Sequence, residues 1–537
     1  MAEKQTLYDQ WVKEDAERQT GLERAKFCAS ISKPWVLPDE DASQMDMGRL
    51  PEPFTSLISR GITNLEGRLL IALYPPGVPW FTLRPAGKFM YDSTVDPAML
   101  QQLQAELHLH EMMMLAKLEQ ADIPGRKSNR RRGGFRNRKR QALTQLLVTG
   151  DSLERLTDDY RIQVYRRDQY VTRRDQTGDV MLHIIKETVD PLTLSDEQLV
   201  TADIDKDVLI GKSVADRKED LYTSVYWDPQ ASIWDIKQEV NRKTIVQSYE
   251  PVSPFLSTAF ELTPTDHYGR GFVELNMGDC RTLNELHERL LDFAATASKQ
   301  LWVTDYASQV RPRDLAKPSG SVIQARVAAG QVQDVACMKV DKISDFNVVY
   351  QTTMSKRNDL AQAMLMEGES TPTGERVTAY QVSRVAMELE GSLGGLYSPI
   401  ADMQQIPLVE RLMYQMRKDK ILPALPEGSV EIEAVTGLPA LSRERDQARL
   451  MNAMQALSQF GPEVMGRINL GELVDIIFTQ SNVYHPGLVK SDEQLAAEEQ
   501  ARQQMQMQAA AQQEMVRTAG AVAEDSLTQG GGGQPNA

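Results

Sequence analysis

The chain has 537 residues, a formal net charge of −15 and a pI near 5.1. This length exceeds what one hydrophobic core usually fills, so several domains are expected. Proteins that wrap nucleic acid tightly are usually basic, so any contact with DNA should be loose or confined to one patch. Three widely separated cysteines argue against a disulfide scaffold or a cysteine zinc site, and they fit a reducing compartment.

The first half of the chain changes from a helical to a β-rich sequence pattern at about residue 160. Residues 1–120 are predicted to be mostly helical, with proline-rich breaks. The longest apolar run, LLIALY at 69–74, is far shorter than the ~20 residues that span a bilayer. No signal-peptide core precedes it, so we expect a soluble, intracellular protein with no membrane partner. Residues 160–260 are β-rich, with apolar alternation around the turns DQTGD and DPQAS predicting two hairpins.

Two long helices are predicted in the next part of the chain. Thr282 and Glu285 have the spacing of a capping box, and an apolar stripe continues from them to about residue 302. A second helix is predicted from about 343 to 366. The residues between these helices have mixed character, with a loop at RPRDLAKPSGS.

A third long helix should follow the polar segment EGESTPTGER, residues 367–376. Thr378 and Gln381 form a second capping box, and an apolar stripe follows it, with Gly394–Gly395 as the place for a bend. Further on, LPEGSVEIEAVTG predicts a short strand and residues 441–480 a return to helix. The tail from about residue 491 is polar, and its glycine-rich end is predicted to be disordered.

Local motifs give no support for an enzyme. GKS at 211–213 ends like a phosphate-binding loop, but the first glycine of that motif is replaced by Lys206. His108 and His110 are two residues apart and would point to different faces of a helix. No zinc-protease, paired-cysteine or nucleophile-elbow motif occurs. We therefore predict no catalytic residues, no metal site and no cofactor.

The segment RKSNRRRGGFRNRKR, residues 126–140, is a concentrated basic run, with nine Arg or Lys among fifteen residues and no acidic residue. As a phosphate-binding patch it would use five arginines, with Phe135 available for stacking: Arg130, Arg131, Arg132, Arg136 and Arg138. As a structural feature it would be a solvated loop, or a loop paired with the acidic surface of a neighbouring subunit. The sequence leaves both interpretations open.

Longer blocks of the sequence carry a family resemblance. GERVTAYQVSRVAMELEGSLGGLYS, YGRGFVELNMGDCRTLNELHERLL, RGITNLEGRLLIALYPPGVPWFTL and QALTQLLVTGDSL resemble the portal, or head-to-tail connector, proteins of autographivirus-type short-tailed bacteriophages. The resemblance covers most of residues 50–420. The last hundred residues are similar only in character, and the basic run departs from the family pattern.

The resemblance implies an α+β, mainly α-helical fold that assembles as a ring, usually of twelve subunits. Each subunit would have a wing, a two-helix stem, a mixed clip and a helical crown. The N-terminal arm and wing would cover residues 1–281, with the β-rich part at about 160–260. The first stem helix would be 282–302, the clip 303–342, the second stem helix 343–366 and a channel loop 367–377. A long helix returning to the wing would cover 378–425, the crown 426–490 and the tail 491–537.

The function implied is that of a non-enzymatic conduit for double-stranded DNA at one capsid vertex, serving packaging and ejection. Its partners would be other copies of itself, the terminase large subunit, a tail adaptor, scaffolding protein, major capsid protein and internal core proteins. It would belong to the virion and be assembled in the host cytoplasm. Two alternatives remain: a nucleic-acid-binding protein organised around residues 126–140, and a packaging ATPase that rests on GKS alone.

The resemblance also gives the segment after the second stem helix a role, because in portals a loop at this place projects into the channel. The residues expected to face DNA are Glu367, Glu369, Glu375 and Arg376. An ordinary exposed loop is the alternative.

Overall fold

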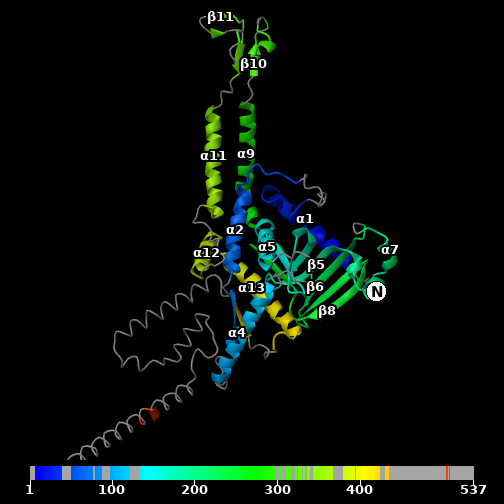
Figure 1. Cartoon of the computed structure of the whole chain (residues 1–537). Coiled ribbons are helices and arrows are strands. Elements are labelled where there is room, and N and C mark those ends of the chain that lie inside the picture. The colour runs from blue at the N-terminus through cyan, green and yellow to red at the C-terminus, as the bar shows by residue number, and fades with distance from the viewer. Residues whose placement is uncertain are drawn as a thin grey trace, which may run out of the picture. The chain divides into compact units, whose positions relative to one another are not determined.

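The computed structural model describes residues 6–38, 50–76, 79–87, 97–120, 134–213, 216–297, 343–366, 379–393, 395–423 and 430–434, short stretches between 301 and 338, and residues 504, 505 and 507. The chain divides into two compact units, Met1–Ser442 and Arg443–Ala537. All of the helices and strands described below belong to the first unit (Figure 1). The helix predicted over 441–480 lies outside the described residues.

The β-rich region is confirmed, and it begins slightly earlier than predicted, at β2 (Asp151–Leu156). A five-stranded antiparallel sheet runs in the order β4-β5-β6-β7-β8, and a three-stranded sheet in the order β3-β2-β9. The bounds are β3 Ile162–Tyr165, β4 Tyr170–Arg174, β5 Val180–Val189, β6 Glu219–Asp228, β7 Ile233–Val240, β8 Lys243–Glu250 and β9 Phe255–Ala259. Short helices η3 (Arg167–Gln169), η4 (Pro191–Thr193), α6 (Asp196–Thr201) and α7 (Lys206–Ile210) lie between them.

Both predicted hairpins are confirmed, and each turn is fixed by its first aspartate. The Asp175 carboxylate accepts hydrogen bonds from the backbone N–H groups of Thr177 and Asp179, both at 2.9 Å, in the β4–β5 turn. In the β6–β7 turn, Asp228 accepts one from Gln230 N at 2.9 Å. Aspartate is frequent in turns because its short side chain can satisfy the backbone two residues on.

The main hydrophobic core lies among helices of the N-terminal and C-terminal parts of the first unit. Its centre is α2 (Leu57–Leu73), whose stripe of Ile58, Ile62, Leu65 and Leu69 is fully buried. Around it lie α1 (Leu7–Ile31), η1 (Pro34–Val36), α4 (Pro97–Gln120), α5 (Phe135–Thr149), α8 (Phe272–Leu275), α12 (Ala379–Ser392) and α13 (Tyr397–Lys418). The apolar run at 69–74 is thus the end of a core helix, and no described helix is long and apolar enough to cross a membrane.

Helices α9 (Met277–Ala297) and α11 (Ile343–Ala363) form an antiparallel pair that extends from this core (Figure 1). Lys356 Nζ lies 2.8 Å from Asp279 Oδ1 near the core, and the rings of Phe293 and Phe346 stack 5.0 Å apart towards the other end. The second predicted helix is confirmed apart from its last turn.

The predicted start of the first helix at residue 282 is wrong. Cys280 N already donates to Asn276 O, so the helix begins one turn before Thr282. The Glu285 carboxylate accepts a hydrogen bond from Arg281 Nε at 2.8 Å, an i,i+4 pair inside the helix. The helix also ends before residue 302, because Leu301–Thr304 forms strand β10.

The described residues between 301 and 338 form strand pairs and a short helix. β10 pairs with β13 (Val335–Met338), and β11 (Val327–Ala328) pairs with β12 (Gln331–Val332). Helix α10 covers Pro312–Leu315. The mixed character predicted for this segment is confirmed among the described residues, but the loop predicted at RPRDLAKPSGS is wrong for its first part, which forms α10.

The long helix predicted after residue 378 is two helices, α12 and α13. Between them Gly395 has φ +89°, a left-handed conformation that glycine adopts without a steric penalty, and its N–H donates to Glu390 O. The predicted strand is β14 (Val430–Ala434), which pairs with β1 (Phe81–Pro85). Strand β1 lies inside a proline-rich break and was not predicted from the sequence.

Candidate functional site

The predicted channel-loop residues Glu367, Glu369, Glu375 and Arg376 lie outside the described residues, as does the Thr378 cap. The structure does describe the two helices that flank this loop, α11 and α12. Both contact α2. We call the contact region of these three helices the loop base, made of residues 57–73, 360–366 and 379–393.

A glycine allows α11 to approach α2 closely in the loop base. A Cβ atom placed on Gly61 would lie 1.9 Å from Sδ and 2.9 Å from Cβ of Met364. Met364 is fully buried, and it directly follows the last helical turn of α11. Because the Met364 Cβ cannot move without its backbone, any side chain at Gly61 would displace the end of α11.

The end of α11 is closed by a left-handed residue that is not glycine. Leu365 has φ +55°, its N–H donates to Gln362 O, and Met366 N donates to Ala361 O. This conformation costs a residue with a side chain about 1–2 kcal/mol. Asn64 Nδ2 donates to Met364 O at 3.0 Å and to Leu365 O at 2.9 Å, so one amide of α2 holds both carbonyls around the strained residue.

The other flanking helix is held to α2 by an ion pair and by packing. Arg68 Nη1 lies 2.7 Å from Glu388 Oε2, with the Arg68 side chain 3% exposed and that of Glu388 40% exposed. On the same helix Val385, Ala386 and Leu389 belong to the core, as does Leu393 directly after it. Helix α2 therefore holds the residues on both sides of the predicted loop.

The C-terminal end of α2 is capped by side chains from other helices. The backbone carbonyls of Ala72 and Leu73 accept hydrogen bonds from Tyr397 Oη at 3.1 Å and Gln405 Nε2 at 2.6 Å. Arg136 donates to the carbonyl of Tyr74. These carbonyls have no partner within the helix, and a cation is favourable at the negative end of the helix dipole. Burial lowers the pKa of Arg136.

The basic run is therefore partly inside the fold. Phe135 packs edge-on to Tyr74, with ring centroids 5.4 Å apart, and parallel to Trp80 at 6.4 Å. Arg138 Nη1 donates to Gln141 Oε1 at 3.0 Å. Arg130, Arg131 and Arg132 lie outside the described residues, and a role of the five arginines in phosphate binding stays a prediction.

Lys139, also in the basic run, forms a buried ion pair with Glu154 of β2. Its Nζ lies 2.9 Å from Glu154 Oε2, and the two side chains are 0% and 1% exposed. The Lys139 ammonium also lies 5.1 Å from the centroid of the Tyr74 ring. Burial lowers the pKa of Lys139 and raises that of Glu154, against the mutual attraction of the two charges.

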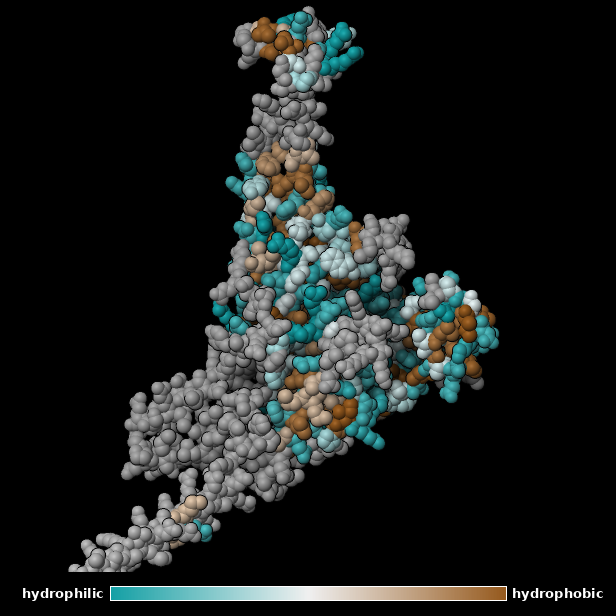
Figure 2. Space-filling model, viewed as in Figure 1, coloured by the Kyte–Doolittle hydropathy of each residue, from teal (hydrophilic) through white to brown (hydrophobic). Residues whose placement is uncertain are grey.

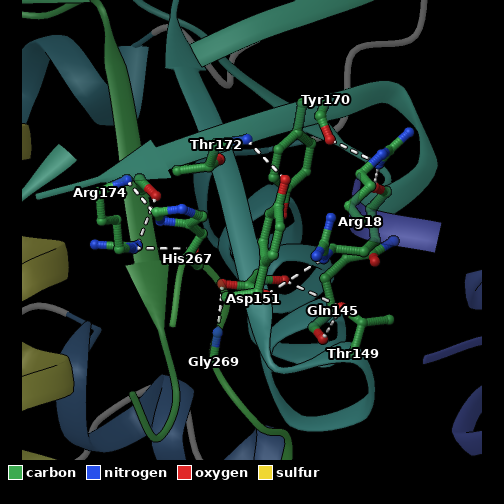
Figure 3. Close-up of polar contacts among 12 residues, drawn as sticks. Arg18, Gln145, Thr149, Asp151, Tyr170, Thr172, Arg174, His267 and Gly269 are labelled. Atoms are coloured by element: carbon green, nitrogen blue, oxygen red, sulfur yellow. Dashed lines mark hydrogen bonds and ion pairs between the residues drawn. The ribbon is translucent and has the colours of Figure 1, made fainter. Parts of the chain in front are cut away.

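A second buried polar network joins α1 to the β-rich region (Figure 3). Arg18 Nη1 donates hydrogen bonds to the backbone carbonyls of Arg167 and Tyr170. The Asp151 carboxylate accepts a hydrogen bond from Gly269 N at 3.1 Å and lies 3.3 Å from Arg167 Nε. These contacts join α1 to η3 and β4, and join β2 to η3 and to the segment before α8. Sequence reasoning missed it, since an isolated arginine in an amphipathic helix has no distinguishing pattern.

The motifs that could indicate chemistry have ordinary structural positions. Gly211 of GKS follows the C-terminal end of α7, whereas a phosphate-binding loop must open a helix. His110 is buried, and His108 lies 3.1 Å from Glu111 on the same helix. Among the described residues, no group of three or more His, Cys, Asp or Glu side chains could hold a metal ion.

Residues 4–486 match the model of the bacteriophage head to tail connecting protein family. The chain belongs to this family. It is 28% identical over 530 residues to the portal protein of Escherichia phage T7, covering 94% of this chain and 93% of the relative. The portal protein of Pseudomonas phage phiKMV is 27% identical over 497 residues, with 90% and 92% covered. The resemblance to portals of short-tailed phages is confirmed.

Among solved structures, the chain is similar to a chain in the virion of a native gene transfer agent particle, with a TM-score of 0.36 and 12% sequence identity. The match covers 74% of this chain and 86% of the chain in the particle. A chain in the neck of an empty particle of that agent gives a TM-score of 0.38, with 12% identity over 77% and 90%. The family places this chain as the structural connector between a phage head and its tail. The alternative of a nucleic-acid-binding protein organised around residues 126–140 has no support among these relatives.

Proposed function

We propose that the chain assembles into a closed ring of twelve copies at one capsid vertex and forms the channel for DNA packaging and ejection. The observation that carries this proposal is the family match over residues 4–486, together with portal relatives aligned over nearly their whole length. The α9–α11 pair would be the stem, residues 303–342 the clip, the β-rich region part of the wing, and residues 426–490 the crown.

The α9–α11 pair exposes apolar side chains on more than one side, which neighbouring copies in a ring would cover. Leu291, Val348 and Tyr350 are 57%, 64% and 45% exposed, and Figure 2 shows apolar side chains on the outside of this pair. An isolated helix pair that leaves such residues in water is poorly stabilised, because most helical stability in proteins comes from packing of an apolar face. Ring assembly supplies that packing.

Residues 367–377 would project into the channel, with Glu367, Glu369, Glu375 and Arg376 near the DNA. A channel that released many counterions on binding DNA would have a high affinity for DNA, and this affinity would depend strongly on salt concentration. A net charge of −15 with isolated arginines suits passage better than binding. Ion pairs between Arg376 and Glu375 in channel water would contribute only ~0–1 kcal/mol each, so they could re-form as DNA moves.

The ring would serve as a docking platform, and DNA would be driven by a separate motor. The clip would bind the terminase large subunit and later the tail adaptor. Scaffolding protein, major capsid protein and internal core proteins would contact the same ring during assembly in the host cytoplasm.

The position at one vertex can be tested by labelling. We expect a gold label on an affinity tag at the C-terminus of the full chain to appear at a single vertex of each particle, where the tail attaches. Untagged particles are the control for non-specific label. Labels spread over several vertices, or confined to the distal tail, would contradict the proposal.

A further inference from the structure

Three residues of α2 within the loop base lie on one face of that helix. Gly61, Asn64 and Arg68 are spaced by three and four residues, which places these positions in one row along the helix. Along this row, Gly61 and Asn64 contact the end of α11, and Arg68 contacts α12. One helical face thus holds both flanks of residues 367–378.

We propose that α2 is the anchor of the channel loop and that Asn64 is a positioning residue, which fixes the point where α11 ends and the loop begins. The inference rests on the proposed role of residues 367–377 as the channel loop. It adds a residue that lies 300 positions before Met364, at the end of the helix that leads into the loop.

The chemistry of the contact explains why asparagine is suited to it. A side-chain amide nitrogen carries two N–H donors and no charge. Both donors of Asn64 Nδ2 are used, one on Met364 O and one on Leu365 O. Aspartate has nearly the same shape but offers only acceptor oxygens when ionised, so at this place it would face two carbonyl oxygens without a proton between them.

Helix α2, the proposed anchor, is itself held firmly by other elements. The ends of the loop are therefore held in position relative to the main core. Glu66, two residues after Asn64 in α2, accepts a hydrogen bond from Lys33 Nζ at 2.9 Å, with both side chains almost fully buried. The C-terminal carbonyls of α2 are held by α13 and α5. The end of α11 is therefore fixed relative to the main core as well as to its stem partner α9.

The test compares Asn64→Asp with Thr63→Asp in the full-length chain. Thr63 is the preceding residue of α2 and is exposed. Among the contacts described, its hydroxyl donates only to Ser59 O of the same helix. An aspartate at position 63 therefore places the same new charge in water. We expect Asn64→Asp to accelerate hydrogen exchange at the Leu365 and Met366 amides by about tenfold or more, because two hydrogen bonds that each contribute about 0.5–1.5 kcal/mol are lost. The melting temperature and ring assembly should change little, and the yield of DNA-filled particles should fall. Thr63→Asp should behave like the parent.

Unchanged exchange at Leu365 and Met366 in Asn64→Asp would overturn the anchoring role. Faster exchange with normal DNA-filled particles would overturn the link to DNA passage. A variant lacking residues 368–373 separates this proposal from the one it rests on. If that deletion impairs packaging while Asn64→Asp does not, the loop is functional and Asn64 is not its positioning residue. If neither change affects packaging, the channel-loop assignment is wrong as well.

Discussion

Replacing Lys139 with methionine is expected to lower the free energy of unfolding by about 3–5 kcal/mol. The substitution keeps most of the apolar side chain but removes the ammonium group 2.9 Å from Glu154 Oε2. Glu154 is 1% exposed, so its carboxylate would remain in the core without its counter-charge, or would have to take up a proton. Urea denaturation of the purified chain, followed by tryptophan fluorescence, measures the change.

The matched control removes both charges. Lys139→Met with Glu154→Leu should recover most of the lost stability, because an apolar pair of similar volume avoids the cost of burying charge. If Lys139→Met alone leaves the denaturation midpoint unchanged, the pair is not buried as described. If the double variant is as unstable as the single one, packing rather than charge explains the loss.

Deletion of residues 368–373 is expected to leave rings intact and to reduce the number of DNA-filled particles severely. The segment lies between α11 and α12, and each of these helices has its own contacts with α2, so we expect both contacts to persist when the segment is shortened. Arg376→Ala should have a smaller effect in the same direction, because exposed ion pairs contribute little to stability and the arginine would act only on passing DNA. Counting full and empty particles by electron microscopy measures both variants.

A control variant tests whether the loss of packaging is specific to the arginine of residues 367–377. Arg24→Ala removes an arginine of α1 that is 54% exposed and lies outside both the proposed clip and residues 367–377, so it serves as a charge-matched control for Arg376→Ala and should package DNA like the parent. If the deletion and Arg376→Ala both package and retain DNA like the parent, residues 367–377 are not the channel element. If rings fail to form, the segment has a role in subunit contacts instead.

The local signals in the sequence predicted elements well where short-range chemistry decides the structure. The hairpins at Asp175 and Asp228 are examples, because turn and alternating pattern lie within about twenty residues of each other. The prediction failed where a local signal was overridden. Thr282 and Glu285 have capping-box spacing, yet the chain is already helical before them and Glu285 bonds to Arg281.

Long-range contacts could not be predicted from the sequence. Strand β1 exists because β14 pairs with it, with Phe81 opposite Ala434. The loop base depends in the same way on Gly61 meeting Met364 and on Asn64 reaching two carbonyls of the same turn. A glycine and an asparagine in an amphipathic helix resemble ordinary surface positions until the partner helix is known. Arg136 was predicted as a phosphate contact for its charge alone, and its place at the end of α2 was not foreseen.

The most direct test of the proposed ring is the native mass of the purified full-length chain. Twelve copies of a 60.3-kDa chain would give a particle of about 720 kDa. We expect one closed species near this mass, with a stoichiometry independent of protein concentration and with a central opening visible by electron microscopy. A monomer at every concentration, or open assemblies that grow with concentration, would contradict the account.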